Sequence, residues 1–143
     1  MAFNNDQFSL ANKTAIVTGA GGRGNSIGRA YAFGLGNAGA NVLVADLNAD
    51  GARNVAEELK ASGINAVACQ VDIADPQSTK EMAKKAKEAF GGVNILVNNA
   101  AMMAELSFEQ IQTTDIESWN KLFAVNLTGA LNCVRPAPVD RHR

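Results

Sequence analysis

Short apolar runs alternate along the chain with segments whose apolar positions recur at helical spacing. The runs are rich in valine, isoleucine and alanine, as expected for strands that are covered on both faces. They predict strands at residues 13–18, 41–46, 64–71 and 93–97. The periodic segments predict helices at residues 26–38, 48–62, 76–90 and 115–135, and residues 99–113 are predicted to form a loop.

Residues that favour helix ends support these boundaries. Ser26 is a candidate N-cap of the first helix, and Asp75 is followed by Pro76 at the start of the third. Gly34 and Gly36 lie inside the first helix, where each costs about 1 kcal/mol relative to alanine. Close packing against the sheet is one reason to tolerate them.

Strands that alternate with helices predict parallel pairing and right-handed crossovers. The predicted fold is a single α/β domain over residues 1–143, a doubly wound, Rossmann-like parallel sheet that is incomplete on its C-terminal side. In such sheets a ligand binds beyond the carboxyl ends of the strands, where the strand order reverses. Gly19 and Asn98 stand at two such ends, so we expect them to face each other across a crevice.

Composition narrows the class of partner. The 143-residue chain has a net charge of −1 and a pI near 5.8, which argue against nucleic acid and anionic membranes. Neither a signal-peptide pattern nor an apolar run long enough to span a bilayer is present. Cys69 and Cys133 form no metal-binding pattern and are expected to be buried, so we predict a cytoplasmic protein without a metal site.

The stretch from Thr14 to Ala32 contains the most informative pattern, because an apolar strand breaks into glycines before a helix begins. A pyrophosphate needs bare backbone N–H groups, and the helix N-terminus adds further unpaired ones. The strand–glycine loop–helix order therefore favours a dinucleotide site. The glycines alone do not exclude a flexible loop between two core elements.

Asp46 ends the second predicted strand, 18 residues after Gly28. A carboxylate there can accept both hydroxyls of an adenosine ribose and would repel a 2′-phosphate, which favours NAD over NADP. A helix-capping or surface aspartate is the alternative. Arg23 in the glycine loop is a basic residue that could accommodate a 2′-phosphate and so favour NADP.

Five segments in order resemble the N-terminal, cofactor-binding part of the classical short-chain dehydrogenase/reductase family. They are VTGAGGRGNSIG at 17–28, VADLN at 44–48, VDIAD at 71–75, ILVNNAA at 95–101 and WNKLFAVNLTGAL at 119–131. The resemblance implies NAD-dependent hydride transfer between an alcohol and a ketone substrate. It also implies a role for individual residues: Gly19, Ser26, Ile27 and Gly28 at the pyrophosphate, Asp46 at the ribose, Asp72 and Ile73 at the adenine, and Asn98 and Ala100 beside the nicotinamide.

Asn126 matches the asparagine of the family's catalytic tetrad, which bends its helix and helps to hold a water in a proton relay. The alternative is an asparagine that only forms structural hydrogen bonds, and the sequence alone favours that alternative.

Three departures from the family pattern bear on activity. Gly19 and Gly28 are nine residues apart, a longer loop than usual, and Ala101 replaces the last glycine of the family's Asn-Asn-Ala-Gly. No Tyr-x-x-x-Lys is present, since the only tyrosine, Tyr31, is followed four residues later by Leu35. A phenol of lowered pKa is the base that this chemistry needs. We therefore expect a cofactor-binding portion that is inactive alone, or alternatively a non-catalytic nucleotide-binding or interaction module.

The sequence also predicts that the chain self-associates. Residues 93–97 would form an uncovered parallel edge, and Trp119, Phe123 and Leu127 would form an apolar patch on the last helix.

Overall fold

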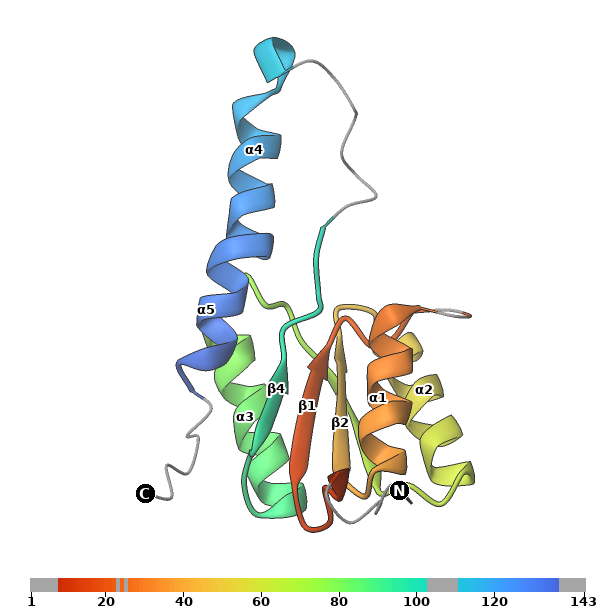
Figure 1. Ribbon diagram of the computed structural model, residues 1–143. Coiled ribbons are helices and arrows are strands. Elements are labelled where there is room, and N and C mark those ends of the chain that lie inside the picture. Colours follow the sequence, from red (N-terminus) through yellow and green to blue (C-terminus); the bar gives the residue numbers. More distant parts are fainter. Residues whose placement is uncertain (1–7, 23, 25, 103–110, 137–143) are drawn as a thin grey trace.

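The computed structural model describes residues 8–22, 24, 26–102 and 111–136. Its centre is a parallel sheet in the order β3-β2-β1-β4, of which Figure 1 labels β2, β1 and β4 side by side. The strands are β1 (Thr14–Thr18), β2 (Asn41–Asp46), β3 (Ala66–Gln70) and β4 (Ile95–Val97). Ile16 at the middle of β1 lies opposite Leu43 of β2 and Leu96 of β4. The predicted reversal of strand order between the first and fourth strands is confirmed, although the third and fourth strands are shorter than predicted.

Helices cover both faces of this sheet. The helical elements are α1 (Ile27–Asn37), α2 (Ala49–Ala61), α3 (Pro76–Phe90), η2 (Ile111–Thr113), α4 (Ile116–Phe123), the π-helical segment η3 (Ala124–Thr128) and α5 (Gly129–Val134). Figure 1 shows α1 and α2 on one side of the sheet and α3 and α5 on the other. The doubly wound α/β prediction is therefore confirmed.

The core follows from the two-residue period of the strands. Ile16 and Leu43 point to the α3 side, where they join Met82 in one buried cluster. Their neighbours Val17 and Val44 point to the opposite side and join a second cluster with residues of α1 and α2. Both faces of the sheet are thus apolar, which explains why the strands appear in the sequence as continuous apolar runs.

The predicted helix caps are present. The Ser26 side chain accepts a hydrogen bond from the Arg29 N–H, and the Asp75 side chain accepts one from the Gln77 N–H. The N-cap of α4 is Asp115, whose pKa is held below its usual range because its carboxylate accepts hydrogen bonds from Ser118 and Glu117. Ser26 and Asp75 were predicted from the sequence to stand at these helix starts, whereas the cap at Asp115 was not predicted.

The two glycines inside α1 have different reasons to be there. A Cβ atom on Gly36 would lie 2.6 Å from Ile64 Cγ2, so this glycine permits close packing. Gly34 is exposed, and a Cβ atom there would meet nothing within 4 Å. Close packing thus explains Gly36 but not Gly34.

The two cysteines are buried on the α3 side of the sheet, as expected. Burial raises the pKa of the Cys133 thiol to about 11 and also raises that of Cys69. Both thiols therefore stay protonated at neutral pH and act as small apolar groups.

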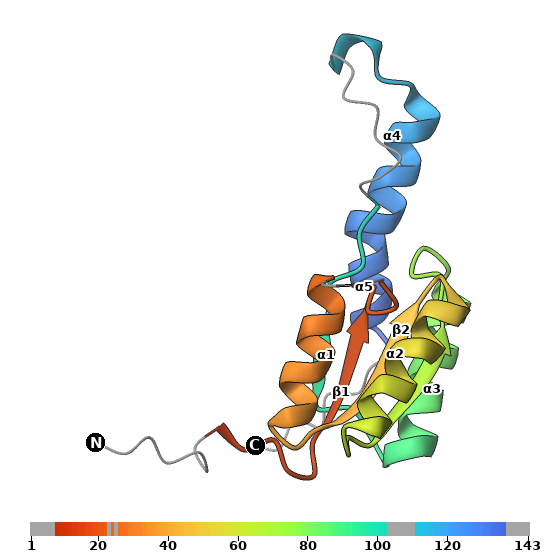
Figure 2. The same ribbon diagram turned by 90° about the vertical axis from the view of Figure 1, so that its right-hand side faces the viewer.

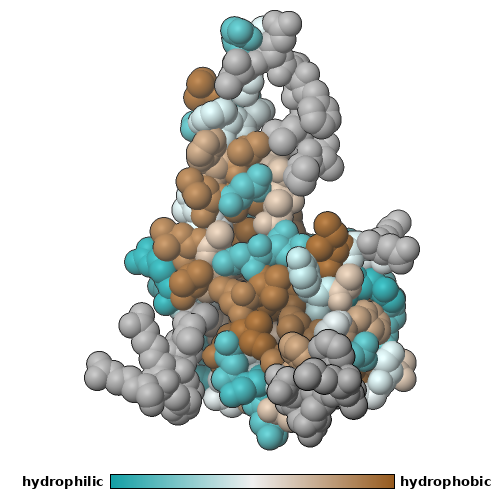
Figure 3. Space-filling model, viewed as in Figure 1, coloured by the Kyte–Doolittle hydropathy of each residue, from teal (hydrophilic) through white to brown (hydrophobic). Residues whose placement is uncertain are grey.

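The long C-terminal helix leaves the body of the molecule at its α4 end (Figure 2). None of the eight α4 residues, all of them described, is buried. Large apolar side chains lie exposed along α4, η3 and α5, and we call them the apolar stripe: Ile116, Trp119, Phe123, Leu127, Leu131 and Val134. Figure 3 shows apolar surface running along this helix and over the neighbouring sheet region. Within the described residues, no helix is long and apolar enough to cross a membrane.

Candidate functional site

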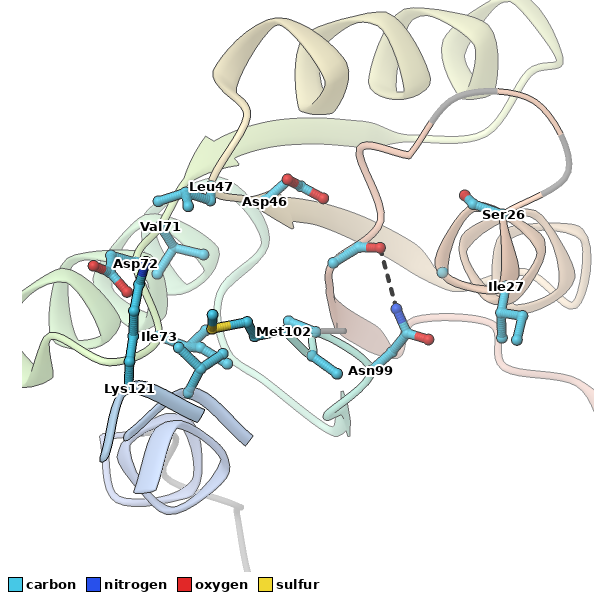
Figure 4. Close-up of a pocket in the computed structure, with 15 residues that line it drawn as sticks. Ser26, Ile27, Asp46, Leu47, Val71, Asp72, Ile73, Asn99, Met102 and Lys121 are labelled. Carbon is cyan, nitrogen blue, oxygen red and sulfur yellow. Dashed lines mark hydrogen bonds between the residues drawn. The ribbon is translucent and has the colours of Figure 1, made fainter. Parts of the chain in front are cut away.

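A cleft of about 680 Å³ opens beyond the carboxyl ends of the strands. It is lined by Gly19, Ser26, Ile27, Gly28, Asp46, Leu47, Val71, Asp72, Ile73, Asn99, Ala100, Ala101, Met102, Lys121 and Val125 (Figure 4). Every predicted cofactor-binding residue except Asn98 is in this set. Residues from four strand ends and from α4 and η3 therefore converge on the point where the strand order reverses.

The floor of the cleft is a close contact between the end of β1 and the segment after β4. Gly19 has a φ of +66°, and a Cβ atom there would lie 2.7 Å from Ala100 Cα. The buried Thr18 hydroxyl donates to the Val97 carbonyl and accepts hydrogen bonds from the N–H groups of Asn99 and Ala100. Gly19 is thus required both by its backbone conformation and by the space available.

The start of α1 forms one wall. A Cβ atom on Gly28 would lie 2.3 Å from the Gly19 carbonyl oxygen, so the helix N-terminus sits directly on the end of β1. The first N–H groups of a helix have no partner within the helix, and among the described residues the Ser26 side chain caps only that of Arg29. This end of the cleft is suited to an anionic group.

Asp46 lies at the end of β2 on the same rim. Its Oδ2 accepts a hydrogen bond of 2.8 Å from the Gly21 N–H, and its Oδ1 accepts one of 2.9 Å from the Asn48 N–H. The carboxylate is thus fixed in direction by the glycine loop and by the start of α2. Each carboxylate oxygen has a further lone pair with which to accept a ligand hydroxyl.

The opposite wall is the segment after β3. The Asp72 carboxylate accepts a hydrogen bond from the Ala74 N–H, and the Asp72 N–H donates to the Ser78 hydroxyl. The buried Asn132 side-chain amide of α5 supports this segment by donating a hydrogen bond of 3.0 Å to the Ile73 carbonyl. Ile73 is buried and, with Val71 and Val125, gives this wall an apolar surface suited to a flat base.

Asn99, rather than the predicted Asn98, faces Gly19. The Asn99 Nδ2 donates to the carbonyl oxygen of Thr18 at 2.9 Å and to that of Gly19 at 3.1 Å, and Figure 4 shows the second of these bonds. The Asn98 amide instead donates to the Ala130 carbonyl on α5 at 3.5 Å, and Asn98 does not line the cleft. The expected pairing of Gly19 with Asn98 is therefore wrong, because successive side chains at a strand end point in opposite directions.

Asn126 lies in the π-helical segment η3 and contacts the main chain at Met102. Its Oδ1 accepts a hydrogen bond of 2.7 Å from the Met102 N–H, and its Nδ2 donates to the Met102 carbonyl at 3.1 Å. Asn126 itself is not among the residues that line the cleft, whereas Met102 is. The visible contribution of Asn126 is to tie η3 to the segment after β4, and its catalytic role stays a prediction.

Leu47, Val71, Asn99, Ala101, Met102, Lys121 and Val125 also line the cleft but were not predicted. Most are small or apolar, and no pattern in the sequence separates them from core residues. The Lys121 side chain extends from α4 toward Asp72 (Figure 4). Its position in the cleft depends on where a helix far along the chain is placed, so the sequence did not reveal it. Arg23, the predicted alternative partner for a 2′-phosphate, lies outside the described residues. No group of residues that could hold a metal ion occurs among those that the structure describes.

Comparison with known proteins decides the family. The family model described as short chain dehydrogenase matches residues 13–138. The chain belongs to the short-chain dehydrogenase family. This family consists of oxidoreductases that use NAD or NADP and act on small molecules. It is the family indicated by the five segments in the sequence.

Two curated relatives illustrate the match. An uncharacterised oxidoreductase of Mycobacterium tuberculosis is 44% identical over 123 residues, covering 86% of this chain and 48% of the relative. A 7α-hydroxysteroid dehydrogenase of Escherichia coli is 44% identical over 98 residues, covering 68% of this chain and 37% of the relative. The chain thus spans about half the length, or less, of these relatives.

Solved structures agree with the fold. The crystal structure of a hydroxysteroid dehydrogenase from Escherichia coli matches with a TM-score of 0.83 and 33% identity, over 94% of this chain and 54% of that one. A short-chain type dehydrogenase/reductase from Mycobacterium marinum matches with a TM-score of 0.84 and 29% identity, over 92% and 51%.

Proposed function

We propose that this chain is the NAD-binding portion of a short-chain dehydrogenase that interconverts an alcohol and a ketone. The observation that supports this most strongly is the placement of the Asp46 carboxylate on the rim that also carries the glycine loop and the α1 N-terminus. A negative charge at that point favours a ribose with free hydroxyls over one with a 2′-phosphate. NAD is therefore the proposed cofactor, and NADP the less favoured one.

The residues present fit such a cofactor. Unpaired N–H groups at the start of α1 suit the pyrophosphate, and Asp46 suits the adenosine ribose. Asp72 and the apolar wall at Ile73 suit the adenine, and Ala100 lies where the nicotinamide end would be held. When bound, NAD supplies the acceptor for hydride. The chain's own residues orient it and shield one side from water.

Proton transfer needs a base, and no tyrosine or histidine is among the described residues that line the cleft. No Tyr-x-x-x-Lys occurs in the sequence, and the only histidine, His142, lies outside the described residues. Losing a positioned acid–base group costs about 10²–10⁴-fold in rate. We propose that the 143-residue chain binds NAD but does not turn over alcohols by itself.

One experiment tests both parts. The purified chain is titrated with NAD and NADP by calorimetry, and then incubated with NAD and a panel of secondary alcohols while NADH absorbance is followed. We expect saturable binding with tighter affinity for NAD and no NADH above background. Tighter binding of NADP would refute the cofactor choice. Steady NADH production that survives repurification and is lost in Asn126→Ala would refute the proposed inactivity.

A further inference from the structure

The glycine loop and the start of α2 approach each other more closely than side chains would permit. A Cβ atom on Gly51 would lie 2.1 Å from the Gly21 carbonyl oxygen, and one on Gly21 would lie 2.7 Å from the Ala52 nitrogen. Both glycines are buried, and neither has a positive φ. Glycine is therefore required at these positions by the close approach, not by the backbone conformation.

This contact reaches the Asp46 carboxylate. The Gly21 N–H donates to Asp46 Oδ2 at 2.8 Å, and a Cβ atom on Gly21 would lie 2.8 Å from Asp46 Cβ. On the other side, the Asn48 N–H donates to Asp46 Oδ1, while the Asn48 side chain accepts the Gly51 N–H at 3.1 Å. One continuous set of contacts thus runs from Gly51 through Gly21 to Asp46.

We infer that Gly51 is a positioning residue for nucleotide binding, because it lets the lengthened glycine loop settle on α2 and hold the Asp46 carboxylate toward the cleft. This inference rests on the proposed function. Gly21 against Gly51 holds this end of the glycine loop on α2, and the Gly21 N–H donates to Asp46.

The substitution Gly51→Ala separates this role from an ordinary structural one. In the first turn of a helix, alanine normally stabilises relative to glycine. Here the added methyl group would collide with the Gly21 carbonyl carbon and oxygen, at 3.0 and 2.1 Å. The loop must move away, which breaks the hydrogen bond from Gly21 to Asp46 even if α2 stays intact.

The test compares Gly51→Ala with Gly34→Ala, whose Cβ atom would meet nothing within 4 Å. Both variants are titrated with NAD and ADP-ribose, and circular dichroism monitors folding. We expect Gly51→Ala to weaken both affinities about tenfold or more, as for loss of one hydrogen bond to a charged group, and Gly34→Ala to change neither. Added to Asp46→Ala, Gly51→Ala should have little further effect, because the two act through the same contact.

A measurement without ligand keeps the inference testable if Gly51→Ala folds poorly or the native chain binds no nucleotide. Amide hydrogen exchange should show the Gly21 N–H protected in the native chain and exposed in Asp46→Ala. A folded Gly51→Ala with native affinity, or an unprotected Gly21 N–H in the native chain, would overturn the inference. Absence of any NAD binding by the native chain, with Gly21 protected, would refute the proposed function and leave the contact standing.

Discussion

Asp46 is the side chain on which the proposed preference for NAD over NADP depends. It is held by two main-chain N–H groups, from Gly21 and Asn48, so its charge is fixed on the rim of the cleft. Such hydrogen bonds to a charged group are worth about 1.5–3 kcal/mol each and restrict how far the carboxylate can turn. A ligand thus meets a preset acceptor rather than a mobile one.

Replacing Asp46 by alanine should lower NAD affinity about tenfold, since one charged acceptor for the ribose hydroxyls is lost. NADP affinity should fall less or rise, because the repulsion of a 2′-phosphate is removed as well. Asp50→Ala is the matched control, because Asp50 is also acidic and lies nearby on α2 but outside the cleft. Titrations of both variants with both cofactors provide the check, and an unchanged NAD-to-NADP ratio in Asp46→Ala would contradict it.

At the residue scale the sequence could place Gly19, Gly28 and Asp46 but not Asn99 or Thr18. Gly19 and Gly28 belong to a contiguous strand–loop–helix pattern, and Asp46 ends the next apolar run, 18 residues after Gly28. The choice between Asn98 and Asn99 depends on where β4 ends, and β4 is only three residues long, Ile95–Val97. Thr18 looks like any strand threonine until the segment after β4 is placed against it.

At the scale of elements, the alternation of strands and helices was predictable because each helix carries its own start signal and each strand its own apolar run. The resemblance implied a bend at Asn126, but the π-helical form of the segment η3 around it could not be predicted. It coincides with the contact between Asn126 and Met102, which lie 24 residues apart, so no local propensity encodes it. The predicted helix at 115–135 is thus correct in extent, and its interruption depends on tertiary contacts.

Helix α1 offers a direct test of the packing. Gly34→Ala should raise the free energy of unfolding by about 0.5–1 kcal/mol. Alanine has less backbone freedom than glycine in the unfolded chain, so less entropy is lost when the helix forms. Gly36→Ala should lower it by about 1–3 kcal/mol, since the methyl group would overlap Ile64. Urea denaturation of both variants measures the difference. Equal effects of the two substitutions would show that α1 does not pack against Ile64.

At the scale of the whole molecule, the described residues leave the apolar stripe and the edge strand β4 uncovered. Ile116 is 70% exposed and Leu127 is 63% exposed, and within the described part of the chain β4 pairs only with β1. Exposed apolar side chains arranged along one helix favour association. An open parallel edge offers further unpaired main-chain groups.

We therefore expect the isolated chain to self-associate at micromolar concentration or to lose fixed tertiary packing. Sedimentation across a concentration series, with Leu127→Lys and Leu131→Lys as the disrupting pair, should show a shift toward monomer in the variant. Lys80→Arg, at an exposed position of α3, is the control because it changes no apolar residue. A native chain that is monomeric at all concentrations and unfolds cooperatively would contradict the expectation.

We propose that the chain holds the adenosine half of NAD, and separate titrations with fragments of NAD test this proposal. The purified chain is titrated separately with NAD, ADP-ribose and nicotinamide mononucleotide. Because the proposed contacts at Asp46, Asp72 and the α1 N-terminus all serve the adenosine diphosphate end, ADP-ribose should bind within about tenfold of NAD. Nicotinamide mononucleotide should show no saturable binding over the same concentration range. Binding of nicotinamide mononucleotide as tight as that of NAD, or no binding of ADP-ribose, would contradict the account.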